Sequence, residues 1–363
     1  MKGKVAVMSE PGKLSFAEYD LPSPGPGAVL VKVIRTNVCG SELHIWQGHH
    51  PTKKSGVLGH EMVGEIAALG EGVATDYAGN PVKVGDRVAA AYFITCRKCH
   101  PCQQGQFNLC ENAYQHWVKD PEVAPHFHGS FGTHYYLPPD QYFYKVPDNV
   151  PDAAAASANC ALSQVYYGID KSGVRYGDTV VIQGAGGLGL NACAVAKEYG
   201  ATVVCIDGVA SRLDKAKQFG ADHLISMAEY DTLEKRVKAV RELTGGKGAD
   251  ICMELTGVPA ALNEGIHLLR YGGTYISIGN ISPGQLTPFD PGLMTRKGIT
   301  IHSYIRYDPW YLQKALQFIS RTIHKYPFDQ MLDAEFHLED VDVALDKSAS
   351  REVTRATIIA NYG

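Results

Sequence analysis

Long apolar runs and basic clusters are both missing from this sequence of 363 residues. A membrane-spanning helix needs about 18 or more consecutive apolar residues, and no stretch of the chain approaches that length. The opening residues, MKGKVAVMSEPGKL, also lack the apolar core of a signal peptide. With a formal net charge of −4 and no basic block, the chain is poorly suited to nucleic acid or an anionic membrane. We therefore expect a cytoplasmic protein with no nucleic-acid partner and no membrane partner.

Internal repeats and low-complexity tracts are absent as well, so we expect no repeat architecture. Hydrophobic residues make up 45% and charged residues 20%, which is typical of a globular protein. At roughly 100–200 residues per domain, the length predicts two domains.

The first part of the chain, to about residue 155, consists of short strand-like runs separated by Gly and Pro. Residues 28–36 and 86–93 are two such runs, and the pattern predicts a β-rich domain with many loops. Near residue 152 the composition changes to an Ala-rich stretch that predicts a helix, with Asp152 as its N-cap.

From residue 177 the chain alternates apolar runs with helical patterns such as residues 190–199. Apolar strands joined by helices are typical of a parallel sheet, and six of them predict an α/β fold with a Rossmann-type doubly wound sheet. The predicted strands are residues 179–184, 202–207, 223–226, 250–255, 274–279 and 300–304. A helix from Trp310 to about Lys325 and the apolar ending ATIIA predict a return to the first domain. The domains are then residues 1–156 with 305–363, and residues 157–304.

A glycine-rich sequence follows the first of these strands and begins a helix, which is the context that a dinucleotide-binding G-x-G-x-x-G motif requires. Its glycines allow backbone N–H groups to approach a pyrophosphate at the helix N-terminus. The residues expected to bind the cofactor are Gly184, Gly186, Gly187, Leu188 and Gly189. A glycine-rich turn without a ligand is the alternative.

The second strand ends at Asp207, whose carboxylate can accept hydrogen bonds from the adenosine ribose hydroxyls. The same charge would repel a 2′-phosphate, so the sequence favours NAD over NADP. Arg212 lies five residues further on and can contact the ribose or a phosphate. A solvated surface position is the alternative for Arg212.

Four of the nine cysteines lie within residues 96–110, in the spacing C-x2-C-x2-C-x7-C. In the cytosol such a cluster indicates metal binding rather than disulfides. Four thiolates surround Zn²⁺ tetrahedrally in structural sites, which leave no position for water or substrate. We therefore predict a structural zinc site at Cys96, Cys99, Cys102 and Cys110. An iron–sulfur cluster or unligated cysteines are the alternatives, although the Cys-Pro run of a ferredoxin is missing because Glu111 follows Cys110.

Several short motifs occur together in one order along the chain. They are CGSELH from Cys39, GHE at residues 59–61, the four-cysteine loop, CALSQVYYG from Cys160, GAGGLG from Gly184 and DGVASR from Asp207. In these motifs the chain resembles, over essentially its whole length, the zinc-dependent medium-chain alcohol dehydrogenase family, and in particular its polyol, threonine and secondary-alcohol branches. The resemblance implies a GroES-like catalytic domain at residues 1–156 and 305–363 and an NAD-binding Rossmann domain at residues 157–304.

The resemblance also implies a catalytic zinc held by Cys39, His60 and Cys160, with a fourth position open to water or substrate. Glu61 corresponds to the family's glutamate beside the metal. Glu42 stands where the family usually has Asp, and we expect it to orient His60. With the structural site, this gives two zinc ions per chain.

Further roles follow from the same resemblance. Ser41 is expected to bond the substrate oxygen and His44 to pass the proton to water. Arg355 is expected to bind the cofactor pyrophosphate, since Gly40 replaces an Arg that some relatives use. Trp46 and Tyr92 are expected to line the substrate pocket, with a core position as the alternative for each.

The segment from Glu111 to Tyr136 departs from the family's short connection at this point. It is either a lid that shapes the pocket or a solvated surface excursion. Its unusual residues are His116, Trp117, His126, Phe127, His128 and His134.

The expected activity is reversible hydride transfer from a secondary alcohol, polyol or related small hydroxyl compound to NAD, giving a ketone or aldehyde and NADH. A carbonyl reductase working in reverse is the alternative, and a non-catalytic NAD-binding protein is an alternative of another class. The family forms homodimers or homotetramers, often through the last strand of the cofactor domain, here near residues 300–304.

Overall fold

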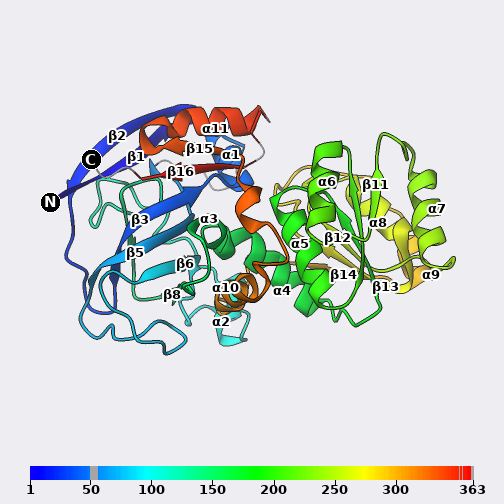
Figure 1. The fold of residues 1–363 in the computed structure, drawn as a ribbon, viewed down its shortest axis with the longest axis horizontal. Coiled ribbons are helices and arrows are strands. Elements are labelled where there is room, and N and C mark those ends of the chain that lie inside the picture. The colour runs from blue at the N-terminus through cyan, green and yellow to red at the C-terminus, as the bar shows by residue number, and fades with distance from the viewer. Residues whose placement is uncertain (50–55, 351, 354, 361–363) are drawn as a thin grey trace. The chain divides into compact units, whose positions relative to one another are not determined.

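The computed structural model describes residues 1–49, 56–350, 352–353 and 355–360, which form two compact units (Figure 1). Unit 1 comprises Met1–Ser163, Asp308–His324 and Phe328–Gly363, and unit 2 comprises Gln164–Tyr307 and Lys325–Pro327. The first boundary thus lies seven residues beyond the expected 156/157, because the segment carrying Cys160 packs against strands of unit 1.

Unit 1 is β-rich, as predicted. One sheet has the order β15-β16-β3-β5-β6-β8, with β7 also paired to β3, and a smaller sheet has the order β2-β1-β4. The runs expected at residues 28–36 and 86–93 form β3 and β6. The strands of the larger sheet are β3 (Val29–Asn37), β5 (Glu61–Leu69), β6 (Arg87–Ile94), β7 (His134–Leu137), β8 (Gln141–Lys145), β15 (Ala334–His337) and β16 (Ala356–Ile359). Those of the smaller sheet are β1 (Lys2–Glu10), β2 (Lys13–Asp20) and β4 (Gly56–Val57).

Short helices connect and cover the strands of unit 1. They are α1 (Gly40–Trp46), α2 (His100–Gln103), α3 (Asp152–Ala155), α10 (Tyr311–Thr322) and α11 (Val341–Ala349), together with a π-helix at Ala158–Leu162 and 3₁₀ turns at Phe107–Leu109, Phe328–Met331 and Leu338–Asp340. The prediction that Asp152 caps α3 is wrong. Pro151 is the N-cap, and Asp152 lies inside the helix, where its carboxylate accepts a 2.7 Å bond from Arg87.

The segment from residue 111 to residue 133 contains no regular helix or strand, yet much of it packs tightly. Phe127 and Phe131 are fully buried, and Trp117 belongs to the core cluster that includes Leu58. His128 is buried as well, while Gln115 and Val118 face solvent. A solvated excursion therefore does not describe this segment, because its aromatic residues form part of the core of unit 1.

Unit 2 is the predicted doubly wound fold. Its six strands have the order β11-β10-β9-β12-β13-β14, all pairs parallel. The strands are β9 (Thr179–Gln183), β10 (Thr202–Asp207), β11 (His223–Ser226), β12 (Ala249–Glu254), β13 (Leu269–Ser277) and β14 (Thr300–Ser303). The helices are α4 (Ser163–Lys171), which begins in unit 1, α5 (Gly187–Glu198), α6 (Ala210–Gln218), α7 (Leu233–Leu243), α8 (Ala261–Leu268) and α9 (Pro291–Lys297).

Strand β13 begins five residues earlier than the expected residue 274. The sequence there reads Tyr271-Gly272-Gly273, which resembles a turn, and the pairing with β12 shifts register at this point. The centre of the sheet is apolar, and Cys252 packs there with Val181 and Tyr275.

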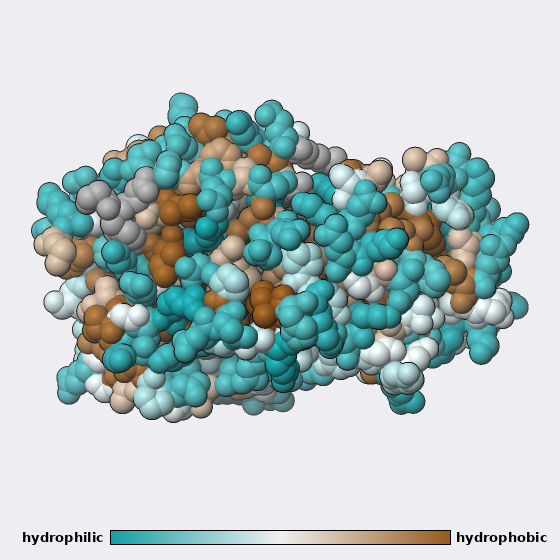
Figure 2. Space-filling view, viewed as in Figure 1, coloured by the Kyte–Doolittle hydropathy of each residue, from teal (hydrophilic) through white to brown (hydrophobic). Residues whose placement is uncertain are grey.

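On the face seen in Figure 2, hydrophilic side chains cover most of the surface and hydrophobic side chains gather only in small patches. Among the described residues, no helix combines the length and the apolar character that crossing a membrane demands.

The imidazole of His134 links the stability of unit 1 to pH. It is buried at the start of β7, opposite Lys32 on β3, and burial with the nearby Lys32 lowers the pKa of His134 from 6.5 to about 4. Between these two pH values the unfolded chain binds a proton that the folded chain does not, so this stability is complete above pH 6.5 and is lost as the pH falls towards 4.

We therefore expect His134→Gln to lose less free energy of unfolding than the parent between pH 7 and pH 5, by about 1–2 kcal/mol, in paired urea titrations. Equal losses in the two proteins would contradict a histidine that is held neutral by burial.

Candidate active site and metal centres

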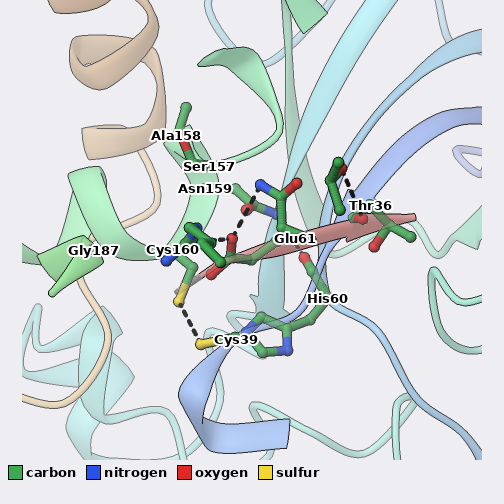
Figure 3. A network of polar contacts seen from close by, with 12 residues as sticks. Thr36, Cys39, His60, Glu61, Ser157, Ala158, Asn159, Cys160 and Gly187 are labelled. Atoms are coloured by element: carbon green, nitrogen blue, oxygen red, sulfur yellow. Dashed lines mark hydrogen bonds and ion pairs between the residues drawn. The ribbon is translucent and has the colours of Figure 1, made fainter. Parts of the chain in front are cut away.

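Four side chains from three distant segments of unit 1 converge. Cys39 is the N-cap of α1. His60 directly precedes β5 and Glu61 begins it, while Cys160 lies in the π-helix. One metal-binding atom from each lies within 4.8 Å of those of the others. Figure 3 shows the two sulfur atoms facing one another with His60 beside Cys39. The structure thus brings together the three predicted catalytic ligands and the predicted neighbouring glutamate.

The loop before His60 requires a glycine. Gly59 has a φ of +86°, and a Cβ there would lie 2.5 Å from the backbone nitrogen of Phe131. This close approach is fixed by backbone hydrogen bonds from Ser130 to Gly59 (3.0 Å) and from Phe131 to Leu58 (2.9 Å). Only glycine adopts this conformation without strain, so the loop holds His60 in one place.

A buried asparagine joins the π-helix to the strands. The amide of Asn159 donates to the carbonyl of His60 and to the carbonyl of Ala90, each at 2.7 Å, and the residue is fully buried. Ser163 is the C-cap of the π-helix, and its hydroxyl donates to the carbonyl of Ala158 at 2.6 Å. π-Helical turns are rare and often occur at functional sites, and this one carries Cys160.

The geometry of the donors fits a zinc ion. The sulfur atoms of Cys39 and Cys160 are 3.8 Å apart. Two Zn–S bonds of about 2.3 Å at a tetrahedral angle place their sulfurs at about that separation. The carboxylate of Glu42 lies 3.0 Å from Nδ1 of His60, which leaves Nε2 for the metal, and its other oxygen accepts the backbone N–H of Cys39 at 2.8 Å. Glu42 thus occupies the orienting position that was predicted for it.

The charges of the cluster favour a cation. A hydrogen bond from the thiol of Cys160, together with the nearby His60, brings the pKa of Cys39 well below its usual value. The same hydrogen bond and burial raise the pKa of Cys160. Burial raises the pKa of Glu61 to about 7, against the opposing charge of Arg355. A metal ion would replace the shared proton between the two sulfurs and stabilise both thiolates.

Glu61 and Arg355 form a fully buried ion pair. The same oxygen of Glu61 is 3.4 Å from the amide nitrogen of Asn37, and its other oxygen has no hydrogen-bond partner among the described residues. An unpaired buried carboxylate oxygen beside two sulfurs suits a group that approaches a metal. Arg355 was predicted to bind pyrophosphate; the structure places it against Glu61, and the pyrophosphate contact stays a prediction.

The remaining predicted side chains of α1 differ in their surroundings. Ser41 and His44 are half-buried and lie three residues apart on one face of the helix. Trp46 is in the core, and its indole N–H donates to Asp346 at 2.8 Å, so the core alternative describes it. Tyr92, in contrast, lies with its ring centroid 5.0 Å from that of His60.

In unit 2 the glycine-rich loop has the geometry of a nucleotide-binding turn. Gly184 has a φ of +97°, and α5 begins at Gly187 with Gly186 as its N-cap. A Cβ on Gly189 would lie 1.8 Å from the carbonyl oxygen of Gly184, so the turn can close this tightly only with glycine. Leu188 is half-buried in the first turn of α5.

Asp207 ends β10 beside this loop. Its carboxylate accepts the backbone N–H of Ala185 at 2.7 Å and that of Val209 at 2.8 Å. These bonds fix the carboxylate next to the loop, and ribose recognition by Asp207 stays a prediction. Arg212 is half-buried in the first turn of α6.

The four cysteines of residues 96–110 also come together, with their sulfurs within 4.8 Å of one another. This separation suits a single ion. Backbone N–H groups point at the sulfurs, from Cys96 to Cys110 at 3.3 Å and from Cys99 to Cys96 at 3.4 Å. The amide of Asn112 adds a third such contact to Cys96, at 3.3 Å. Hydrogen-bond donors of this kind stabilise thiolates, and the closed set of four matches a structural zinc site.

Comparison with known proteins supports the same class. Two family models match, the alcohol dehydrogenase GroES-like domain over residues 25–148 and the zinc-binding dehydrogenase over residues 187–321. A 5-exo-hydroxycamphor dehydrogenase from Pseudomonas putida is 35% identical, covering 94% of each chain, and a sorbitol dehydrogenase from Halalkalibacterium halodurans is 37% identical over 77% of each. The crystal structure of an alcohol dehydrogenase from Thermotoga maritima matches with a TM-score of 0.93 at 29% identity, covering 99% of this chain and 100% of that one.

The fold and the metal-binding residues define an oxidoreductase of the zinc-binding dehydrogenase class. Within that class, the chain belongs to the zinc-dependent medium-chain alcohol dehydrogenase family, and unit 1 contains its GroES-like domain.

The contribution of Asn159 can be tested by metal release. Asn159→Asp keeps the shape but places a carboxylate against two carbonyl oxygens, so we expect the metal held near Cys160 to bind about 10–100-fold more weakly. Titration with a chromogenic chelator should show one pool of zinc released earlier than in the parent. Asn112→Asp is the matched control, because it perturbs the four-cysteine loop instead. Identical release curves for Asn159→Asp and the parent would contradict the role of this amide.

Proposed function

We propose that this chain is an NAD-dependent zinc alcohol dehydrogenase that oxidises a secondary alcohol, a polyol or a related small hydroxyl compound. The convergence of Cys39, His60 and Cys160, with Glu61 beside them, supports this most strongly. Three protein donors leave a tetrahedral ion one open position, as catalytic zinc requires.

The reaction removes a hydride and a proton from the alcohol, giving ketone or aldehyde, NADH and a proton in water. Zinc supplies a Lewis acid that lowers the pKa of a coordinated hydroxyl. Glu42 holds His60 in the tautomer that presents Nε2. Ser41 takes the hydroxyl proton and His44 passes it to water, which their spacing on α1 allows. The guanidinium of Arg355 compensates the charge of the buried Glu61 carboxylate beside the site.

The cofactor is bound by unit 2. The N-terminus of α5 and the loop from Gly184 to Gly189 receive the pyrophosphate. Asp207 accepts the ribose hydroxyls and rejects a 2′-phosphate, with Arg212 at the edge of the same site. Arg355 is proposed to add a pyrophosphate contact.

Carbonyl reduction is the same reaction run backwards, and the cellular ratio of the two cofactor forms sets its direction. Relatives are named both as dehydrogenases and as D-xylulose reductases, which suits a reversible enzyme. A non-catalytic NAD-binding protein is less favoured, because a scaffold has no use for an open set of metal donors.

We further propose two zinc ions per chain and a cytoplasmic homodimer or homotetramer. Strand β14 is the edge of its sheet, and Ile301 on it is 36% exposed, which suits pairing with a second copy.

Replacement of one metal-binding sulfur tests the catalytic assignment. Cys39→Ser should reduce turnover of a reactive alcohol by at least about 1000-fold while NAD still binds, because unit 2 is untouched. Zinc content should fall from two ions per chain towards one. NAD binding by fluorescence is the internal control. Undiminished turnover would contradict the assignment of Cys39 as a ligand.

The role of Asp207 can be tested by measuring the preference for NAD over NADP. Asp207→Gly removes the ribose acceptor and the charge, so we expect kcat/KM with NAD to fall about 10–100-fold and kcat/KM with NADP to rise. Asp214→Ala, on the exposed side of α6, is the matched control. An unchanged ratio of kcat/KM with NAD to kcat/KM with NADP in Asp207→Gly would contradict the assignment of Asp207 to the ribose hydroxyls.

A further inference from the structure

Glu254 ends β12 in unit 2, and its side chain is buried, with only 2% of the residue exposed. One carboxylate oxygen accepts the backbone N–H of Thr256 at 2.8 Å and that of Gly257 at 2.7 Å, and it also accepts the hydroxyl of Thr256 at 2.9 Å. The other oxygen accepts the backbone N–H of Asn280 at 3.0 Å. A single buried carboxylate therefore joins the loop that follows β12 to the loop that follows β13.

The two loops touch at a pair of glycines. A Cβ on Gly279 would lie 2.7 Å from the backbone nitrogen of Gly257 and 2.7 Å from the carboxylate of Glu254. Gly257 has a φ of +72°, and a Cβ there would lie 3.2 Å from the carbonyl oxygen of Gly279. Because neither residue has a side chain, the loops can approach this closely, and the carboxylate holds them together.

Both loops lie at the edge of the sheet where a doubly wound fold binds its ligand. The strand order reverses between β9 and β12, which are parallel neighbours, so their carboxyl ends lie at the same edge. Ligands bind outside the carboxyl ends at such a reversal. The turn of Gly184 follows β9 there, and a Cβ on Gly184 would lie 2.9 Å from the methyl group of Thr256. The loop after β12 therefore continues the surface that begins at the glycine-rich turn.

The hydrogen bonds to Glu254 also orient the peptide groups of the loops. In a trans peptide the carbonyl points opposite to the N–H. Three backbone N–H groups point at the carboxylate, so the carbonyl oxygens of the same peptide groups, which belong to Leu255, Thr256 and Gly279, point away from it. Acceptors of this kind suit a ligand group that donates hydrogen bonds, as the primary amide of nicotinamide does.

Resting on the proposed function, we infer that Glu254 is a positioning residue that shapes the surface for the nicotinamide half of the cofactor. Its oxygens are engaged by the loops, so it acts through them and makes no contact with the cofactor itself. Asp207, at the end of β10, is proposed to bind the adenosine half. The two carboxylates therefore affect opposite ends of one ligand, and loss of Glu254 should weaken only one of them.

The test compares the dissociation constants (Kd) of NADH and ADP for the full chain loaded with zinc, measured by calorimetry. ADP keeps the adenosine and both phosphates of the cofactor but lacks the nicotinamide and its ribose. Glu254→Gln replaces one acceptor oxygen by an NH₂ donor, which faces a backbone N–H without bonding it. We expect the Kd of NADH to rise about 10-fold and the Kd of ADP to change by less than about 2-fold.

Asp250→Asn is the matched control. Asp250 lies at the opposite end of the same strand, where its carboxylate accepts the backbone N–H of Thr179 at 2.8 Å and pairs with Arg270. This variant should leave the ratio of the two Kd values unchanged. Glu254→Asp decides the matter if Glu254→Gln does not fold. It keeps the charge but is one methylene shorter, so it cannot reach both loops, and the Kd of NADH should again rise alone.

Weaker binding of NADH with unchanged binding of ADP would support the positioning role. Equal weakening of both ligands would overturn it, because a general disturbance of unit 2 affects the whole cofactor. Unchanged binding of both ligands in a folded variant, or the same shift in Asp250→Asn, would also overturn it. A parent protein that binds neither NADH nor NADPH would instead overturn the proposed function.

Discussion

Two buried side chains hold the metal-binding residues in register, and the rest of the site depends on them. Glu42 joins Cys39 to His60, because one carboxylate oxygen accepts the backbone of the first and the other faces the imidazole of the second. Asn159 joins His60 to the π-helix of Cys160 through its amide. These hydrogen bonds connect three separate segments of the chain. They help to offset the conformational entropy that is lost when the segments become ordered. A buried polar side chain costs free energy when its partners are lost, so these bonds favour a single arrangement of the site.

The metal donors and the glycine-rich turn belong to different units of the structure. Unit 1 provides metal donors in a buried, charged setting, with the Glu61–Arg355 pair beside the sulfurs. Unit 2 provides a parallel sheet whose first strand ends in a tight glycine turn next to Asp207. The four-cysteine cluster lies in a loop with little regular structure of its own, and a closed zinc site there would tie that loop together.

The sequence was sufficient for the features that depend on local pattern. Alternation of apolar strands and helices predicted the sheet of unit 2, because burial on both faces leaves a continuous apolar run. Cysteine spacing predicted the four-cysteine cluster, because a single loop brings its own ligands together. The convergence of Cys39, His60 and Cys160 followed from family resemblance alone, since no local pattern links residues so far apart.

Other features could not be predicted from the sequence, because they depend on contacts that form only in the folded chain. Asn159 follows an Ala-rich stretch, and this local pattern gave no indication of its hydrogen-bond partners. Trp46 is adjacent to the site in sequence but packs in the core, and its indole N–H donates to Asp346. The segment after Glu111 is rich in polar residues, yet Trp117 turns inward and reaches His60, because aromatic burial outweighs the polarity of its neighbours. Gly272 and Gly273 suggested a turn where β13 continues.

Cobalt substitution tests whether Cys39, His60 and Cys160 form an open metal site. With Co²⁺ exchanged into this site, we expect intense thiolate-to-cobalt absorption and tetrahedral visible bands that shift when a secondary alcohol is added. The shift reports a ligand entering the open position. Visible bands that arise from the four-cysteine loop alone, or that do not respond to any alcohol, would contradict an open metal site at these residues.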